Sequence, residues 1–467
     1  MNISLSSYLH YFGSMLNIFV SAIVSLIISN NLGRSAYAEY SIYMSFSTGC
    51  IVLGSLGIPS YLQTFLPRAK RTITKLILQG IIVRLTISLI LAFLVLLFLE
   101  INTILFYALI ISGIFVSILM DMALIVKGHL STVFYVKLIN NFMKLGIIIY
   151  APLGIEGLLT FFALFDFFGS LIAYHSAKFD SPLPHKKNGY KKLFTFYNKF
   201  YPGHISSSLS FFSSPYFFII GLTLLLGKDE ANIVAGFAFI FTMGYFVFNS
   251  ISLTSRFEQV MVAKFIKGLK PDIVGVVRLS SCICAAVGSV LSVHSNAINE
   301  FILENQYNDT INFLYLIFVS AVVNGISYAY SPQIYKLGRL RVLKISSAIG
   351  MLCSVLTIGV AWIFFGTGFF YSILFFGNIL ISAAKVSTLA MLMRDECSML
   401  SKNLVYVLIQ AFVAFGLVSS ATYISLNFIA FSSSYGVFAS IACHVLISSV
   451  VVLFILKVEY RFRLLGI

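Results

Sequence analysis

A small set of ionisable side chains lies inside long apolar segments of this sequence, where burying a charge is expensive. Arg84 is about 12 Å into its segment at a helical rise of about 1.5 Å per residue, and Lys385 is similarly deep in another. Both are suited to hold an anionic substrate, Arg84 by bidentate contact with a phosphate. The alternative is that these long side chains reach the lipid headgroups. That alternative is favoured for Lys144, which lies nearer its segment end.

Two aspartates also fall within apolar segments. Asp166 is in the middle of its segment, and its short side chain cannot reach far toward water. It could take up a proton and couple transport to an ion gradient, or it could pair with a basic residue. Asp121 stands near the inner end of its segment and is a weaker ion-coupling candidate, because an interfacial position explains it equally well.

Two histidines and an arginine complete the candidate site residues. His10 and His204 occupy corresponding places at the inner ends of two apolar segments, where an imidazole could contact a phosphate or titrate near neutral pH. The alternative for each is a hydrogen-bonded interior histidine. Arg256 closes another apolar segment and belongs either to a substrate cleft or to the loop that follows.

The composition places these residues in a membrane. Of the 467 residues 59% are hydrophobic and 10% are charged, and the mean hydropathy is +0.97. A soluble domain has about 25% charged residues, so the sequence is far outside that class. The outward face of a membrane protein must instead be apolar, and the 46 Phe and 25 Tyr residues fit lipid-facing and interfacial positions.

The elements that position the candidates are therefore transmembrane helices, each needing about 20 mostly apolar residues. Charge clusters and Gly, Pro and Asn breaks divide the chain into about fourteen of them. The predicted spans are 8–30, 40–62, 76–99, 104–126, 137–154, 157–176, 203–226, 235–256, 277–297, 311–331, 345–366, 369–392, 403–423 and 435–457. The sequence predicts an all-α polytopic membrane protein.

The basic residues predict the orientation. With both termini in the cytoplasm, Lys and Arg gather in the cytoplasmic connections, as the positive-inside rule requires. Arg34 and Lys228 fall outside, and the exceptions within spans are Arg84, Lys144 and Lys385. A wrong span count would invert the side of every later loop, so the bias supports the count too. Topology also explains the net charge of +15, and we expect no nucleic-acid partner.

A weak repeat divides the chain in two. Residues 32–46 and 226–240 both begin with Leu-Gly and a basic residue, and each joins the first two helices of a six-helix half. Such halves would be parallel repeats with a substrate cleft between them near the midplane. The predicted divisions are an N-terminal lobe at 1–176, a basic cytoplasmic linker at 177–202, a C-terminal lobe at 203–392, and a terminal helix pair with its tail at 393–467.

The sequence holds no pattern for metal, nucleotide or covalent chemistry. Cys282 and Cys284 are about 200° apart around a helix, so they cannot jointly bind a metal. The six cysteines are interpreted as small packing residues. No nucleotide-binding loop and no Ser/His/Asp grouping on a loop is present. We expect no cofactor, no resident metal and no enzymatic activity.

The two-half pattern and the loop after the first helix resemble the polysaccharide-unit (Wzx-type) flippases of the multidrug/oligosaccharidyl-lipid/polysaccharide (MOP) exporter superfamily. Leu32, Gly33, Ala38 and Tyr40 match the style of that loop, although Ala38 replaces a commonly found glycine. The resemblance implies O-antigen or capsule assembly. The substrate would be an oligosaccharide on undecaprenyl pyrophosphate, carried to the outer leaflet of a bacterial inner membrane.

The resemblance further implies alternating access, with a proton or sodium gradient as the driving force and a polysaccharide polymerase and chain-length regulator as partners. Other functions stay open. A drug exporter of the same superfamily would share the fold, but such exporters usually carry an acidic coupling site in the first helix, which has no carboxylate here. A polymerase would have large basic external loops, and a membrane scaffold would not need Arg84 or Asp166 within lipid depth.

Overall fold

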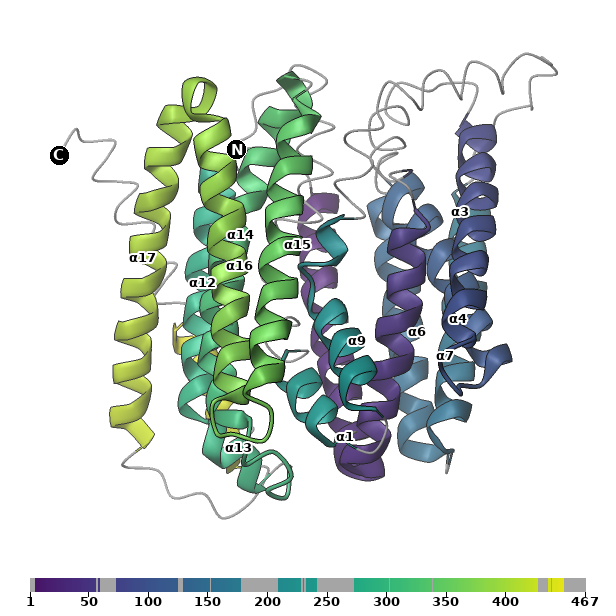
Figure 1. Ribbon diagram of the computed structural model, residues 1–467, viewed down its shortest axis with the longest axis horizontal. Helices are drawn as coiled ribbons and strands as arrows, with labels where there is room; N and C mark the ends of the chain where they lie inside the picture. Colours follow the sequence, from purple (N-terminus) through teal and green to yellow (C-terminus); the bar gives the residue numbers. More distant parts are fainter. Residues whose placement is uncertain are drawn as a thin grey trace.

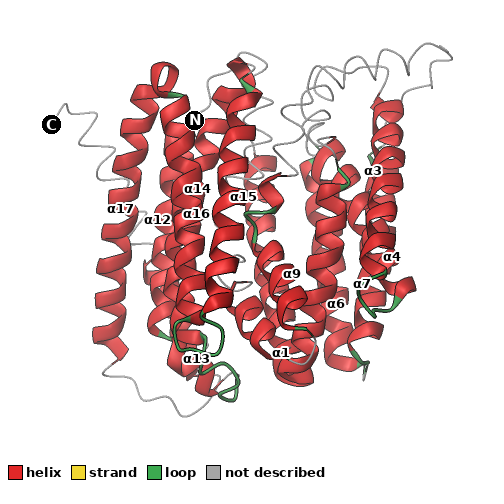
Figure 2. Ribbon diagram, in the orientation of Figure 1, coloured by secondary structure: helices red, strands yellow, loops and turns green. Residues whose placement is uncertain are grey.

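Long helices standing side by side make up the computed structural model of the chain (Figure 1). The structure describes residues 5–55, 73–124, 129–151, 153–177, 209–227, 232–241, 273–301, 303–337, 339–426 and 439–448, with a few isolated positions between them. Over these residues Figure 2 shows helices and short loops and no strand. Of the predicted linker at 177–202, all residues after 177 lie outside this set.

The described helices follow one another along the chain in the order given below. The first six elements are α1 (Leu5–Leu53), α3 (Ile73–Leu96), α4 (Thr103–Phe115), the π-helical η1 (Val116–Leu124), α6 (Leu130–Tyr150) and α7 (Ile155–Ser176). The later elements are α9 (Pro215–Leu226), the segment Asn232–Phe241, α12 (Ile273–Val293), α13 (Ser295–Phe301), η2 (Ile311–Phe313), α14 (Leu314–Leu337), α15 (Leu340–Ile363), α16 (Phe370–Leu392), α17 (Arg394–Leu426) and the terminal segment Ala439–Ser448.

The prediction of an all-helical, multi-pass membrane protein is confirmed. Among the described residues, seven helices are long and apolar enough to cross a bilayer, and shorter apolar helices occupy other predicted spans. The largest departure is α17, which begins at Arg394 rather than at 403. Its first turns are polar, so a search for apolar residues misses them. They contain no Gly or Pro, so nothing ends the helix there.

Unlike a soluble protein, this protein has many large apolar side chains on its outer surface. Its interior is apolar, as in a soluble protein. Large apolar side chains such as Ile90, Phe93 and Leu356 are exposed and suit contact with lipid. The interior combines apolar cores with many buried serines. Within it α12 packs along α17, α15 along α16, and α1 along both α6 and α9. The contact between α1 and α9 joins the two halves of the sequence.

The predicted polar loop at 31–39 is wrong, because α1 stays helical through it except at Gly33. Gly33 has φ 83° and ψ 171°, a backbone conformation essentially confined to glycine. Gly227, its counterpart in the predicted repeat, ends α9 with φ 74° and ψ −175°. The two Leu-Gly positions thus share one conformation, and a single residue at each redirects the chain.

Gly33→Ala is expected to lower the stability of the protein by about 1–3 kcal/mol, the cost of forcing a side chain into this conformation. A Cβ at Gly33 meets no atom within 4 Å, so the loss comes from the backbone alone. Gly359 in α15 also has open space but lacks a positive φ, so Gly359→Ala is the matched control. Thermal unfolding of the purified protein in detergent measures both. Equal melting temperatures for the two variants would contradict the backbone assignment.

Candidate functional site

The Arg84 guanidinium lies inside the helix bundle. Arg84 is 3% exposed, and its α3 helix packs against α1, α4 and η1. Its Nη1 donates to Ser117 Oγ at 2.7 Å and its Nε donates to the Ile51 carbonyl at 3.3 Å. The group is therefore directed into protein and not toward the headgroups. Ser117 belongs to the π-helical η1, a rare geometry that is frequent at functional sites.

The oxygens that Arg84 contacts are neutral in the described part of the chain. Asp121, one turn after Ser117, interacts with Arg84 through its charge. Its carboxylate is bonded instead to Lys137 of α6. Asp121 thus has a basic partner of its own, while the acceptors of the guanidinium among the described residues are a hydroxyl and a carbonyl.

Gln79, which precedes Arg84 on α3, is a polar group that the sequence analysis missed. It is 9% exposed, and neither its amide nitrogen nor its amide oxygen has a hydrogen-bond partner among the described residues. A buried unpaired amide costs about 1–3 kcal/mol, so this side chain is suited to receive a polar ligand. A search for charges passes over a neutral amide, and a glutamine within an apolar run was the available signal.

Lys385 supplies a second interior cation, from α16. Its Nζ donates to Ser213 Oγ at 3.3 Å, just before α9. Its stem lies against Gly350 of α15, where an added Cβ would be 2.9 Å from Lys385 Cδ. Gly350 thus leaves the room that the side chain occupies. Neither Ser213 nor Gly350 was predicted, because both residue types are common and lie far from Lys385 in the sequence.

Asp166 is paired with Lys144. The Lys144 Nζ lies 2.7 and 2.8 Å from the two carboxylate oxygens, joining α6 to α7, and 5.4 Å from the centre of the Phe162 ring. This geometry is the structural alternative considered for Asp166, and Lys144 is held by it rather than extended to the headgroups. His204 and Arg256 lie outside the described residues. So does the side chain of His10, whose backbone is in α1.

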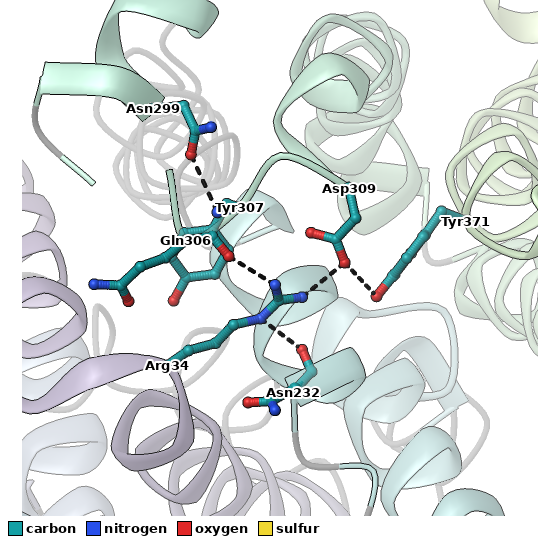
Figure 3. Close-up of polar contacts among 7 residues, drawn as sticks. All are labelled: Arg34, Asn232, Asn299, Gln306, Tyr307, Asp309 and Tyr371. Carbon is teal, nitrogen blue, oxygen red and sulfur yellow. Dashed lines mark hydrogen bonds and ion pairs between the residues drawn. The ribbon is translucent and has the colours of Figure 1, made fainter. Parts of the chain in front are cut away.

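Arg34 joins distant parts of the chain at one end of the bundle (Figure 3). It follows the Gly33 kink, which turns it toward the second half of the sequence. Its Nη2 contacts Asp309 Oδ2 at 2.8 Å, its Nη1 donates to the Gln306 carbonyl at 2.7 Å, and its Nε donates to the Asn232 carbonyl at 2.9 Å. A Cβ on Gly236 would lie 2.7 Å from Nη2, so this glycine leaves space for the guanidinium.

Aromatic side chains fix the acceptors of Arg34. The Tyr371 hydroxyl donates to Asp309 Oδ2 at 3.2 Å, and the Arg34 guanidinium carbon lies 5.1 Å from the centre of the Tyr307 ring. Tyr307 is held by Asn299, which accepts from its backbone N–H at 3.1 Å, and by Ser29, whose hydroxyl lies 2.6 Å from its own. Burial raises the pKa of Tyr307 to about 12, so its phenol stays neutral.

We call the residues of Figure 3 the Arg34 cluster: Arg34, Asn232, Asn299, Gln306, Tyr307, Asp309 and Tyr371. From the sequence, Arg34 was only a charge on the predicted outer side, and Asp309 was not linked to it. The structure brings them together, so α1 is fastened to elements from the second half of the sequence. If the helices part at this end, an ion pair and two further charge-assisted hydrogen bonds must break.

Solved structures of MATE transporters have the same fold. An outward-facing multidrug resistance MATE family transporter of the MOP superfamily has a TM-score of 0.60 at 15% identity, covering 84% of this chain and 96% of its own. An inward-facing one has a TM-score of 0.58 at 16% identity, covering 83% and 96%. A mutant form of the Vibrio cholerae MATE transporter VcmN has a TM-score of 0.56 at 16% identity, covering 84% and 96%.

No family model and no curated protein sequence matches the chain. The likeness to solved structures therefore establishes the fold, which is that of MATE transporters. Outward-facing and inward-facing relatives fit almost equally well, with TM-scores of 0.60 and 0.58. The comparison does not assign a conformation, and the Arg34 cluster is the feature that bears on it.

Asp166→Asn is expected to destabilise the protein, because it leaves the Lys144 ammonium without its partner inside the membrane. The double variant Asp166→Asn with Lys144→Met should recover much of the loss, since no unpaired charge remains. Thermal unfolding of the four proteins gives the coupling. If the double variant unfolds at no higher temperature than Asp166→Asn alone, the ion pair is not the way in which Asp166 stabilises the protein.

Arg34→Gln is expected to favour opening of the bundle at the end where the cluster lies. Removing the ion pair and its hydrogen bonds should shift the equilibrium by about 1–2 kcal/mol, a factor of about 5–30. Ser25 is buried one turn deeper on α1 than Ser29, so a Ser25→Cys reporter in a background without other cysteines can detect opening. The measurement is its labelling rate with a membrane-impermeant thiol reagent.

The matched control for this labelling is Arg341→Gln, which removes an exposed arginine of α15. It should leave the labelling of Ser25→Cys unchanged. If Arg34→Gln also leaves the rate unchanged, the cluster does not hold this end closed.

Proposed function

We propose that this protein is a transporter of the MOP type that moves an oligosaccharide linked to a lipid pyrophosphate across the bacterial inner membrane. Transfer runs from the cytoplasmic to the outer leaflet, with both chain termini in the cytoplasm. The observation that carries the proposal is the pair of interior cations, Arg84 and Lys385, whose described hydrogen-bond partners are neutral.

The charge of these cations favours an anionic substrate. A buried charge without a counterion is costly, and a pyrophosphate would supply the missing negative charge. Arg84 can bind phosphate oxygens through two parallel N–H groups, whereas Lys385 acts as a point charge. One cation comes from each half of the sequence, as expected for a site shared by two halves that rock about it.

The buried polar groups suit the remainder of such a substrate. Sugar hydroxyls must cross about 30 Å of hydrocarbon, and each needs a partner on the way. Gln79 offers an unpaired amide on the helix that carries Arg84. The exposed apolar faces of the helices, such as the one with Ile90 and Phe93 on α3, offer a path in lipid for the polyprenyl chain.

A multidrug exporter is the second candidate, and it is favoured by the names of the structural relatives, which are multidrug resistance MATE transporters. Many exported drugs are cations, which Arg84 and Lys385 would repel. The span at 8–30 has no carboxylate to attract them. The in-span carboxylates Asp166 and Asp121 are paired with Lys144 and Lys137. These charges favour the lipid-linked glycan.

The test is transport by the full-length protein in lipid vesicles loaded with a fluorescent pyrophosphate-linked oligosaccharide. Arg84→Gln is expected to slow transfer about tenfold or more, since it removes charge-assisted hydrogen bonds of about 1.5–3 kcal/mol. Lys402→Gln removes an exposed cation of α17 and is the matched control. Folding of each variant is checked by its thermal unfolding.

Efflux of a cationic dye from the same vesicles separates the two candidates. Wild-type protein should move the glycan and not the dye, with or without a proton or sodium gradient across the membrane. Dye efflux without glycan transfer would overturn the proposal in favour of the drug exporter. Glycan transfer that Arg84→Gln leaves intact would remove Arg84 from the site.

A further inference from the structure

Two histidines meet where three helical elements converge, and neither is among the residues assigned to transport. His294 stands between α12 and α13, and its side chain is fully buried. Ser425 is near the end of α17, while Ser440 and His444 belong to the terminal segment Ala439–Ser448. In Figure 1 the yellow terminal segment passes behind the lower part of α12. The two imidazole centres are 5.2 Å apart.

The position of one hydrogen follows from chemistry alone at His294. Its Nδ1 lies 2.9 Å from the Val290 carbonyl oxygen, which can only accept, so Nδ1 carries a hydrogen. A neutral imidazole has a single N–H, so Nε2 must accept. The Ser440 hydroxyl, 3.1 Å away, therefore donates to it.

The hydrogen bonds around His444 then compete for too few hydrogens. Since Ser440 has already donated, His444 Nδ1, which lies 3.3 Å from Ser440 Oγ, must be a donor, to that hydroxyl or to the Ser440 backbone carbonyl. The other nitrogen, Nε2, lies 2.7 Å from Ser425 Oγ and has to accept from it. Ser425 Oγ also lies 2.8 Å from the Thr422 carbonyl oxygen, which competes for the same hydrogen. A hydroxyl has only one hydrogen to give.

The chain of contacts is thus one hydrogen short when both rings are neutral. It runs Val290 O, His294, Ser440, His444, Ser425, Thr422 O and begins and ends at acceptors. One added proton on His444 Nε2 completes it. The Nε2–H then donates to Ser425, and Ser425 donates to Thr422. The site gains one positive charge, and every contact has its hydrogen.

We propose that this cluster of His294, Ser440, His444 and Ser425 is a proton-binding site that takes up a single proton at His444 Nε2. A second proton is disfavoured, because two imidazolium rings with centres 5.2 Å apart would repel one another. His444 is partly exposed whereas His294 is buried, so His444 is the ring through which the proton enters. Histidine is suited to titrate between about pH 5 and 8.

The sequence segments that carry the cluster contain no charged residue apart from the histidines. No Asp, Glu, Lys or Arg occurs among residues 290–298, 419–426 or 439–448. The packed elements carry these titratable groups: Arg278, Cys282 and Cys284 of α12, Glu300 of α13, Tyr315, Tyr328, Tyr330, Tyr335 and Lys336 of α14, Arg394, Asp395, Glu396, Cys397, Lys402, Tyr406 and Tyr423 of α17, and Cys443 of the terminal segment. Cys284 is buried, while Tyr315, Tyr423 and Cys443 are exposed. The rings of His294 and His444 interact through their charges.

Nitrogen NMR of the full-length protein, labelled with ¹⁵N-histidine and reconstituted in lipid bilayers, tests the site. Between pH 8 and 5 one ring of the pair should change from neutral to cationic while the other stays neutral. His444→Gln should abolish that change, because an amide at the ε position can donate to Ser425 without titrating. His175→Gln, at an exposed histidine of α7, is the matched control and should leave the change intact.

Ser425→Ala is a second variant that keeps both rings, and it should weaken proton uptake by removing the acceptor of Nε2–H. The proposal is overturned if both rings stay neutral from pH 8 to 5, or if His444→Gln leaves the titrating signal in place. The measurement needs no substrate, so its failure would leave the proposed transport standing. Only a coupling of this proton to transport rests on the proposed function.

Discussion

The cost of leaving a charge or polar group without a partner in hydrocarbon is the constraint on which this structure depends. The protein meets it in three ways. Lys144 and Asp166 neutralise each other between α6 and α7. Arg84 is surrounded by protein and satisfied by neutral oxygens of Ile51 and Ser117. Arg34 lies at the end of the bundle. It forms an ion pair with Asp309 and donates hydrogen bonds to two backbone carbonyls.

Apolar length predicted most of the fold, because a bilayer imposes the length of each helix. This prediction from apolar length failed where residues are polar but still helical. Residues 394–402 are polar yet helical, and residues 34–39 continue α1 although they resemble a loop. What the chain needed between its first two spans was a bend, which Gly33 provides without a loop. The Leu-Gly repeat marks both bends, since Gly227 has the same backbone conformation as Gly33. The repeat does not indicate whether a helix or a loop follows the glycine.

The candidate site was predictable one residue at a time, and its contacts were not. Arg84, Lys385 and Asp166 stand out because a charge in an apolar run is rare. Their partners Ser117, Ser213 and Lys144 come from other helices, and no spacing in the sequence links them. The Arg34 cluster is the extreme case. Arg34 was predicted to lie on the outer side of the membrane, yet only folding brings residues 34, 232, 309 and 371 together.

The neutral acceptors around the interior cations have a consequence for transport. A cation that is already paired with a carboxylate would bind a pyrophosphate weakly. A cation without any hydrogen-bond acceptor would bind the pyrophosphate too tightly to release it. Arg84 lies between these extremes, because its described acceptors are a hydroxyl and a carbonyl, and Asp121, which attracts it through charge, is itself paired with Lys137. Binding then exchanges one set of hydrogen bonds for another, and the net gain of such an exchange is small. The attraction of opposite charges decides which substrate enters, and the modest net gain lets it leave on the other side.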